Sequence, residues 1–247
     1  MMTSKTQEPK LCSLLFETKQ NYNTNLQTLL SLIKQTQASS IIVASELCLT
    51  GFDYEHFEAA AAFAIEATKA LQEASKKKII ILTMIEKREN KFFNIAKIFY
   101  NGEVVHSRAK AKLFRFGGEH KYFSEGNPNE VQIVEVAGVK IALLICFELR
   151  FKELWREIEG ADIIAIPSWW GILRTEHFKT LTQALAIMNQ CYVVASDSAN
   201  KECSKMSAII TPQGEVTYNE QKALLLQTYL SKEVKVMRKY LDVGIDF

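Results

Sequence analysis

Long apolar segments are missing from this sequence of 247 residues, and so is the opening pattern of a secretory signal peptide. No apolar stretch approaches the roughly 20 residues that a helix needs to cross a bilayer. Residues 1–10 are polar and lack the apolar centre of a signal peptide. We therefore expect a cytoplasmic protein that does not act in or on a membrane.

Charge of one sign, cysteine motifs and proline-rich segments are also scarce. The 30 basic and 28 acidic side chains leave a net charge of +2, so we expect no nucleic-acid partner. The five cysteines form no CxxC pair and the four histidines are not closely spaced, which predicts neither a disulfide framework nor a metal site. The four prolines mark no linker, and we expect one domain over residues 1–247.

The apolar patterns predict an α/β protein that mixes hairpins with helical crossovers. Helices are expected at residues 25–34, 56–75, 151–159, 176–189 and 231–238. Strands are expected at residues 11–16, 40–45, 79–85, 92–100, 103–106, 131–136, 140–145, 163–167, 192–196, 208–211, 215–218 and 223–228. Two halves of this kind suggest a four-layer α-β-β-α sandwich with two mixed sheets, although periodicity alone also allows a single doubly wound sheet.

Three chemically capable residues follow predicted strands. Glu46 comes after residues 41–44, Lys110 lies just past residues 104–106, and Cys146 ends the apolar run 141–145. A thiol is mostly protonated at neutral pH, so a nucleophilic Cys146 needs a neighbouring base, and Glu46 is a candidate. Lys110 and the backbone N–H of Phe147 could then stabilise an oxyanion. Together these groups predict acyl transfer at a carbon–nitrogen bond.

Each residue also has an ordinary structural explanation. A buried cysteine usually packs in the core, a glutamate after a strand often caps a helix or joins an ion pair, and a loop lysine is usually solvated. Position alone does not decide between chemistry and packing. The residues around Glu46, Lys110 and Cys146 decide between a catalytic and a structural role.

Three blocks surround these residues in the same order. Residues 45–52 (SELCLTGF) resemble the Pro-Glu-Leu and Thr-Gly-Tyr segments of the nitrilase superfamily of carbon–nitrogen hydrolases. Residues 110–114 (KAKLF) resemble its Lys-x-His-Leu-Phe block, and residues 146–151 (CFELRF) resemble Cys-Tyr-Asp-Leu-Arg-Phe. Weaker similarity extends over most of the chain.

This resemblance implies a role for each residue. Glu46 becomes the general base and acid, Lys110 the oxyanion stabiliser and Cys146 the nucleophile. Glu119 resembles the family's second glutamate, which orients the lysine and the substrate. Lys112 stands where the family usually has histidine, and we assign catalysis to Lys110 because its distance to residues 113–114 matches the family's spacing.

The residue after the cysteine bears on the substrate. Nitrile hydrolases of the superfamily usually carry Cys-Trp-Glu, whereas Phe147 makes the chain similar to branches that cleave small carboxylic amides, including the omega-amidases. The resemblance then implies a cysteine thioester, release of ammonia or an amine, and no cofactor. Trp169, Trp170 and Phe116 are candidates for the substrate pocket, and the two tryptophans equally allow packing in the core or at an interface. Arg150 is a candidate for binding a substrate carboxylate, with a structural role as the alternative.

Some positions depart from the family pattern. Ser45 replaces the usual proline, Gln183 replaces arginine, and Lys205 opens a segment where Gly-x-Ser is usual. These departures keep two alternatives open, namely a non-catalytic interaction protein with the same fold and an enzyme that transfers the acyl group to an amine. The three intact catalytic positions favour an enzyme acting on a small-molecule amide. The resemblance also implies a homodimer or a larger homo-oligomer.

Overall fold

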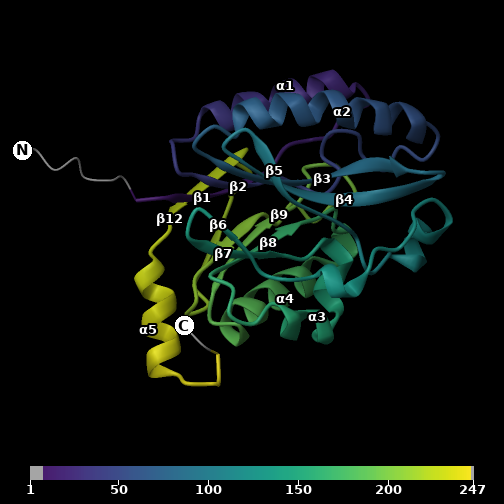
Figure 1. The fold of residues 1–247 in the computed structure, drawn as a ribbon. Coiled ribbons are helices and arrows are strands. Elements are labelled where there is room, and N and C mark those ends of the chain that lie inside the picture. The colour runs from purple at the N-terminus through teal and green to yellow at the C-terminus, as the bar shows by residue number, and fades with distance from the viewer. Residues whose placement is uncertain (1–7, 246–247) are drawn as a thin grey trace, which may run out of the picture.

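The computed structural model describes residues 8–245, in which two β-sheets pack face to face between layers of helices (Figure 1). The polar segment 1–7, part of the region considered for a signal peptide, and the last two residues lie outside the described residues. The predicted four-layer α-β-β-α sandwich is confirmed, and the alternative of a single doubly wound sheet is wrong.

Each sheet has six strands, with a parallel centre and antiparallel edges. The first sheet has the order β12-β1-β2-β3-β4-β5. Its strands are β1 (Lys10–Leu14), β2 (Ile41–Val43), β3 (Ile79–Arg88), β4 (Lys91–Tyr100), β5 (Glu103–Ala109) and β12 (Leu224–Thr228).

The second sheet repeats this plan in the order β11-β10-β9-β8-β7-β6, with β7, β8 and β9 parallel. Its strands are β6 (Val134–Val136), β7 (Val139–Leu143), β8 (Ile163–Pro167), β9 (Tyr192–Ser196), β10 (Ala208–Ile210) and β11 (Val216–Tyr218). Because the central strands are parallel, their carboxyl ends lie at one edge of each sheet, which is where an active site can be assembled.

Helices cover the outer face of each sheet. Figure 1 shows α1 (Tyr22–Lys34) and α2 (Phe57–Ala74) over the first sheet, and α3 (Lys152–Glu157) and α4 (Thr175–Met188) over the second. The last helix, α5 (Ser231–Tyr240), follows β12 and stands at the side of the sandwich. Helix α1 begins where the Asn21 side chain accepts the Thr24 N–H at 2.9 Å, an N-cap that satisfies an otherwise unpaired helix donor. None of the helices in residues 8–245 is long and apolar enough to span a membrane.

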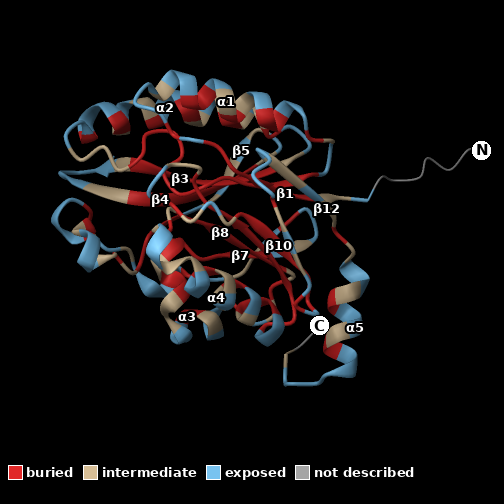
Figure 2. Cartoon of the chain, turned by 180° about the vertical axis from the view of Figure 1, so that it is seen from behind, coloured by how far each residue is buried: buried red, intermediate tan, exposed pale blue. Residues whose placement is uncertain are grey.

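The alternating side chains of the strands divide the core into layers. In β2, Ile41 and Val43 pack in the large cluster that includes Ile141 of the second sheet, while Ile42 packs with Leu29 of α1. This alternation follows from the two-residue period of a strand. Each such buried side chain contributes about 1.5–3 kcal/mol to folding. Figure 2 shows the buried residues concentrated in the two sheets and the inward faces of the helices.

Two hydrogen bonds fix the sheets relative to one another. Ser13 Oγ of β1 donates to Ala195 O at 2.6 Å, and Ser196 Oγ of β9 donates to Leu14 O at 2.6 Å. All four residues are buried, so each bond satisfies a backbone carbonyl that water does not reach. These two bonds hold the sheets in one relative position. The loops at the edges of the sheets are therefore also held in fixed positions relative to one another.

Candidate active site

Three loops bring Glu46, Lys110 and Cys146 together. Glu46 lies three residues after β2, Lys110 directly follows β5, and Cys146 lies three residues after β7, where it opens the short 3₁₀ turn η4 (Cys146–Arg150). The first two belong to one sheet and Cys146 to the other, so the site spans the boundary between the sheets.

Lys110 lies between two carboxylates. Its Nζ donates to Glu46 Oε1 at 2.7 Å and to Glu119 Oε1 at 2.8 Å, and its side chain is completely buried. Burial lowers the pKa of Lys110, but the charges of Glu46 and Glu119 outweigh burial and hold the pKa above its ordinary value. The two neighbouring carboxylates therefore favour the charged ammonium form of Lys110.

The backbone of Lys110 is held on both sides. Its N–H donates to Asn94 O at 2.8 Å, and its carbonyl accepts from the Gly126 N–H at 2.8 Å. A Cβ at Gly126 would lie 2.5 Å from Ala109 O, so this close approach requires glycine.

Glu46 has two oxygens in different surroundings. Oε1 accepts from Lys110 and also from Asn94 Nδ2 at 2.7 Å, whereas Oε2 has no hydrogen-bond partner in residues 8–245. Burial raises the pKa of Glu46 to about 7, and the positive charge of Lys110 offsets part of this rise. A carboxyl group with this pKa can both accept and return a proton near neutral pH.

Cys146 is held in a strained backbone conformation. Its φ is 45°, in the left-handed region that non-glycine residues rarely adopt, and its side chain is 8% exposed at the bottom of a pocket. Burial raises the pKa of the thiol well above its ordinary value, and the Glu46 charge raises it further, against the opposing effects of Lys110 and the Trp169 backbone. The thiol is therefore protonated at neutral pH and needs a base to become a nucleophile.

Glu119 connects Lys110 to the wall of the pocket. Its Oε2 accepts the Phe114 N–H at 2.9 Å while its Oε1 accepts from Lys110, and the residue is 4% exposed. Phe114 and Glu119 both line the pocket above Cys146. Glu119 therefore sets the position of Lys110 and of one pocket wall at the same time.

The pocket is small and carries two guanidinium groups. Its volume is about 30 Å³, and its lining consists of Phe114, Glu119, Cys146, Phe147, Arg150, Trp169, Trp170, Gly171 and Arg174. Arg150 lies over the Trp170 ring at 4.9 Å from its centroid, and Arg174 lies over the Phe114 ring at 5.2 Å. Burial lowers the pKa of Arg150, and the positive charge of Arg174 lowers it further. Two cations that repel each other next to a thiol favour an anionic ligand.

The aromatic residues proposed for the pocket fall into two groups. Trp169 and Trp170 both line it, and Trp170 is anchored by its backbone N–H on Asp197 Oδ1 at 2.8 Å and by its indole N–H on Arg174 O at 2.7 Å. Phe116 does not line this pocket. Its side chain is 92% exposed, and its ring contacts Phe114 from outside, so the inclusion of Phe116 is corrected.

Lys112 lies apart from the catalytic candidates. It forms an ion pair with Glu153 at 3.2 Å and lies over the Phe151 ring, and its side chain is 27% exposed. The structure thus places Lys110, and not Lys112, between the two buried glutamates.

Two of the three residues that depart from the family pattern form hydrogen bonds to nearby segments. Lys205 has a φ of 58°, a conformation that explains why glycine is usual there, and its N–H donates to Asp197 Oδ2 at 2.8 Å. Gln183 Nε2 of α4 donates to Gly214 O at 2.8 Å and so holds the turn between β10 and β11 against the helix. Ser45 leaves a buried hydroxyl without a partner in residues 8–245.

Sequence reasoning missed Asn94 and Arg174. Asn94 is a fully buried polar residue inside the apolar run of β4, and that interruption was a readable signal. Arg174 lies four residues after Trp170 in the 3₁₀ turn η5 (Ile172–Arg174), and no pattern of the sequence predicted that it would fold back over the pocket.

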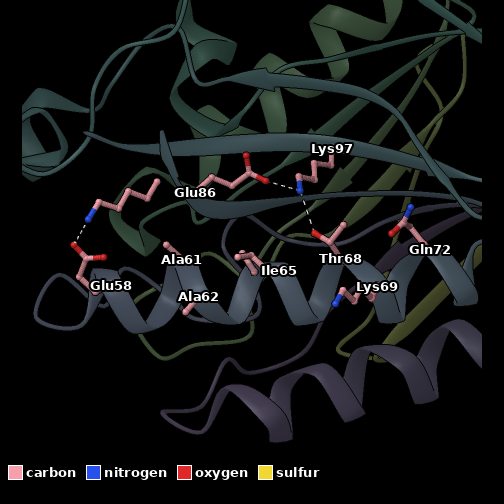
Figure 3. A pocket seen from close by; sticks show the side chains of 11 residues that line it. Glu58, Ala61, Ala62, Ile65, Thr68, Lys69, Gln72, Glu86 and Lys97 are labelled. Atoms are coloured by element: carbon pink, nitrogen blue, oxygen red, sulfur yellow. Dashed lines mark hydrogen bonds and ion pairs between the residues drawn. The ribbon is translucent and has the colours of Figure 1, made fainter. Parts of the chain in front are cut away.

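Other hollows on the molecule lie away from these residues. A groove of about 510 Å³ runs between α2 and strands β3 and β4, where Lys97 contacts Glu86 and Thr68 (Figure 3). Glu46, Lys110 and Cys146 do not line this groove. Within the described residues, no group of three His, Cys, Asp or Glu side chains is placed to hold a metal ion.

Comparison with known proteins identifies the family. Residues 13–229 match the carbon–nitrogen hydrolase family, and the chain belongs to it. A 2-oxoglutaramate amidase of Bacillus subtilis (strain 168) is 31% identical over 194 residues, which cover 74% of each chain. The omega-amidase YafV of Escherichia coli (strain K12) is 33% identical over 148 residues, which cover 57% of this chain and 56% of that protein.

The fold has solved counterparts. The structure of Saccharomyces cerevisiae Nit3, a member of branch 10 of the nitrilase superfamily, superposes with a TM-score of 0.83 and 20% identity, covering 96% of both chains. The match to the carbon–nitrogen hydrolase family confirms the membership that the three sequence blocks predicted, and the solved structure agrees with it in fold.

Proposed function

We propose that the protein hydrolyses a small carboxylic amide through a thioester on Cys146. The observation that carries this proposal is the Lys110 ammonium bound to both Glu46 and Glu119 next to the pocket that Cys146 and Glu119 line. This arrangement supplies a nucleophile, a base and a fixed positive charge. No cofactor is needed for these steps.

In the first half of the reaction, Glu46 accepts the thiol proton as Sγ attacks the amide carbonyl carbon. The developing oxyanion is stabilised by the Lys110 ammonium and by the backbone N–H of Phe147. Glu46 then returns the proton to the amide nitrogen, the carbon–nitrogen bond breaks, and ammonia or an amine leaves. The product is an acyl thioester on Cys146.

In the second half, a water molecule takes the place of the departed amine. Glu46 removes a proton from this water as its oxygen attacks the thioester carbon, and Lys110 again stabilises the oxyanion. The carbon–sulfur bond then breaks, the acid leaves and the thiol recovers its proton. An amine in place of the water would give acyl transfer by the same steps.

The two guanidinium groups support a substrate that carries a carboxylate. Arg150 and Arg174 line the same pocket as Cys146, and neither forms an ion pair with a carboxylate in residues 8–245. Arginine binds carboxylates through two parallel hydrogen bonds. The names of the omega-amidase and 2-oxoglutaramate amidase relatives agree with an amide that has an acid group at its other end.

The test compares wild type with Cys146→Ala on a panel of small amides, with and without a carboxylate. Ammonia release and the intact mass of the protein are measured together. We expect release by wild type alone, with an acyl adduct that maps to Cys146. The matched control is Cys191→Ala, which removes a fully buried thiol that follows α4 and should keep wild-type activity.

Two results would contradict the proposal. Full activity of Cys146→Ala would show that another residue is the nucleophile. If wild type released no ammonia from any amide of the panel and Cys146 did not react with a thiol reagent, the result would favour a non-catalytic protein that uses this fold to bind a partner.

A further inference from the structure

Arg108 and Glu148 form a buried ion pair next to the candidate active site. Arg108 Nη2 lies 2.6 Å from Glu148 Oε2 and Nη1 lies 2.9 Å from Oε1, so the two groups meet in a bidentate pair. Their side chains are 1% and 0% exposed. Neither residue lines the pocket above Cys146, so neither is placed to contact a substrate there directly.

On one side, this pair holds the backbone around Lys110. Arg108 Nη1 donates to Ala109 O at 3.2 Å, and the Ala111 N–H donates to Glu148 Oε1 at 2.6 Å. These contacts involve the residues directly before and after Lys110. The pair therefore fixes the short segment from which the Lys110 side chain projects.

On the other side, the same pair holds the backbone before Cys146. Arg108 Nη2 donates to Leu143 O at 2.8 Å, and the Ile145 N–H donates to Glu148 Oε2 at 2.7 Å. Leu143 is the last residue of β7, and Ile145 precedes the strained Cys146. A residue keeps a left-handed φ only when its surroundings determine its conformation, and these two bonds do so at its N-terminal flank.

We propose that Arg108 and Glu148 are positioning residues that hold Lys110 of the first sheet and Cys146 of the second sheet at a fixed separation. Each Glu148 oxygen accepts one guanidinium N–H and one backbone N–H, so the carboxylate is fully engaged in this linkage. The inference rests on the proposed function, because a fixed separation matters only if lysine and thiol act on one substrate.

A stability role by itself explains the pair poorly. Replacing a buried ion pair by apolar residues of similar volume is often neutral or stabilising, because burying two charges is costly. An apolar pair would not form the hydrogen bonds that hold the two backbone segments in place. A displacement of about 1 Å in a catalytic group can lower a rate about 100-fold.

The test uses Arg108→Lys, which keeps the positive charge and removes the bidentate fork. We expect kcat to fall about 100-fold with little change in KM. A second variant, Glu148→Gln, keeps the shape of the side chain and should show the same division between kcat and KM. Thermal unfolding of both variants establishes that the measured protein is folded.

Arg238→Lys is the matched control. Arg238 is also a buried arginine, with Nη2 donating to Ala161 O at 2.6 Å, but it contacts the segment before β8, at the strand end opposite to the candidate site. This control should lose stability while kcat stays at the wild-type value. If Arg108→Lys and Glu148→Gln likewise kept wild-type kcat per folded molecule, the pair would be structural only and the proposal would be overturned.

A second readout does not depend on amide hydrolysis. The rate at which iodoacetamide alkylates Cys146, mapped by mass spectrometry at several pH values, reports the environment of the thiol. We expect alkylation to be slower in Arg108→Lys than in wild type at pH 8, because Lys110 no longer holds its charge next to the forming thiolate. An unchanged rate and pH profile would contradict the positioning role even if wild type proved inactive on every amide.

Discussion

Asn94 and Lys110 donate to the same oxygen of Glu46. Asn94 Nδ2 and Lys110 Nζ each lie 2.7 Å from Oε1, which leaves Oε2 as the oxygen without a partner in the described part of the chain. The two donors therefore fix the plane of the carboxylate and reserve one oxygen for the proton of the thiol or of water. The pKa of this carboxyl group and its contribution to the unfolding free energy of the protein can both be measured.

The first prediction concerns the pH dependence of activity. Because the base must be ionised and the pKa of Glu46 is raised to about 7, kcat/KM of wild type should fall as the pH drops below 7. Asn94→Ala removes a hydrogen bond to the ionised carboxylate, which raises its pKa further, so this fall should begin about one pH unit higher.

A pH–rate profile of both proteins checks this prediction. Asn189→Ala is the control, because Asn189 is a buried asparagine whose side chain donates to Trp155 O away from Glu46. Its profile should match wild type. An Asn94→Ala profile that coincides with wild type would show that Asn94 does not tune the base.

The second prediction concerns stability. A carboxyl group whose pKa rises from 4.5 to about 7 on folding contributes stability below pH 4.5, and this contribution is lost as the pH rises through 7. Glu46→Gln has no group to ionise at this position. Its unfolding free energy relative to wild type should therefore increase between pH 5 and pH 8, by on the order of 3 kcal/mol.

Calorimetric unfolding at a series of pH values measures this difference. If the wild-type protein instead gained stability over the variant with rising pH, the ion pair with Lys110 would outweigh the cost of burying Glu46. The sign of the slope decides between the two.

The third prediction concerns substrate choice. Arg174→Met should raise KM for an amide that carries a carboxylate by about 10- to 100-fold and leave KM for a neutral amide nearly unchanged, because only the first loses a charged hydrogen bond. The control is Arg115→Met, which removes an exposed arginine that pairs with Glu125 outside the pocket. Equal effects on KM for both kinds of amide would show that Arg174 shapes the pocket but does not bind the carboxylate of the substrate.

The fourth prediction concerns the loop at Lys205. Its φ of 58° costs a lysine free energy that glycine does not lose, while glycine makes the unfolded chain more flexible. We expect Lys205→Gly to stabilise the protein by about 0.5 kcal/mol, and Lys205→Ala, which keeps a Cβ, to give no gain. Chemical denaturation of the three proteins distinguishes these values, and a loss of stability in the glycine variant would contradict the strain argument.

Local sequence predicted the strands and the residues at their ends. The apolar runs of β8 and β9 gave the observed bounds because continuous burial leaves no ambiguity of face. Strand β6 was expected from residue 131 but begins at Val134, because the 3₁₀ turn η3 (Pro128–Glu130) precedes it and Val131 is buried outside the sheet.

The partners of these residues could not be predicted in the same way. Asn94 meets Glu46, and Arg108 meets Glu148, only after distant strands have paired or the two sheets have packed. Phe116 was a candidate for the pocket, but it lies in the short 3₁₀ turn Arg115–Gly117 and its side chain is 92% exposed. These outcomes depend on tertiary packing, on which residue spacing carries no information.

The burial of the catalytic candidates has a consequence for the strength of their electrostatic interactions. Cys146 is 8% exposed, and the side chains of Glu46 and Lys110 are completely buried. A substrate seated in the pocket would cover the part of Cys146 that still meets solvent. Because charges interact more strongly where water is excluded, the substrate itself would strengthen the attraction between the Lys110 ammonium and the oxyanion.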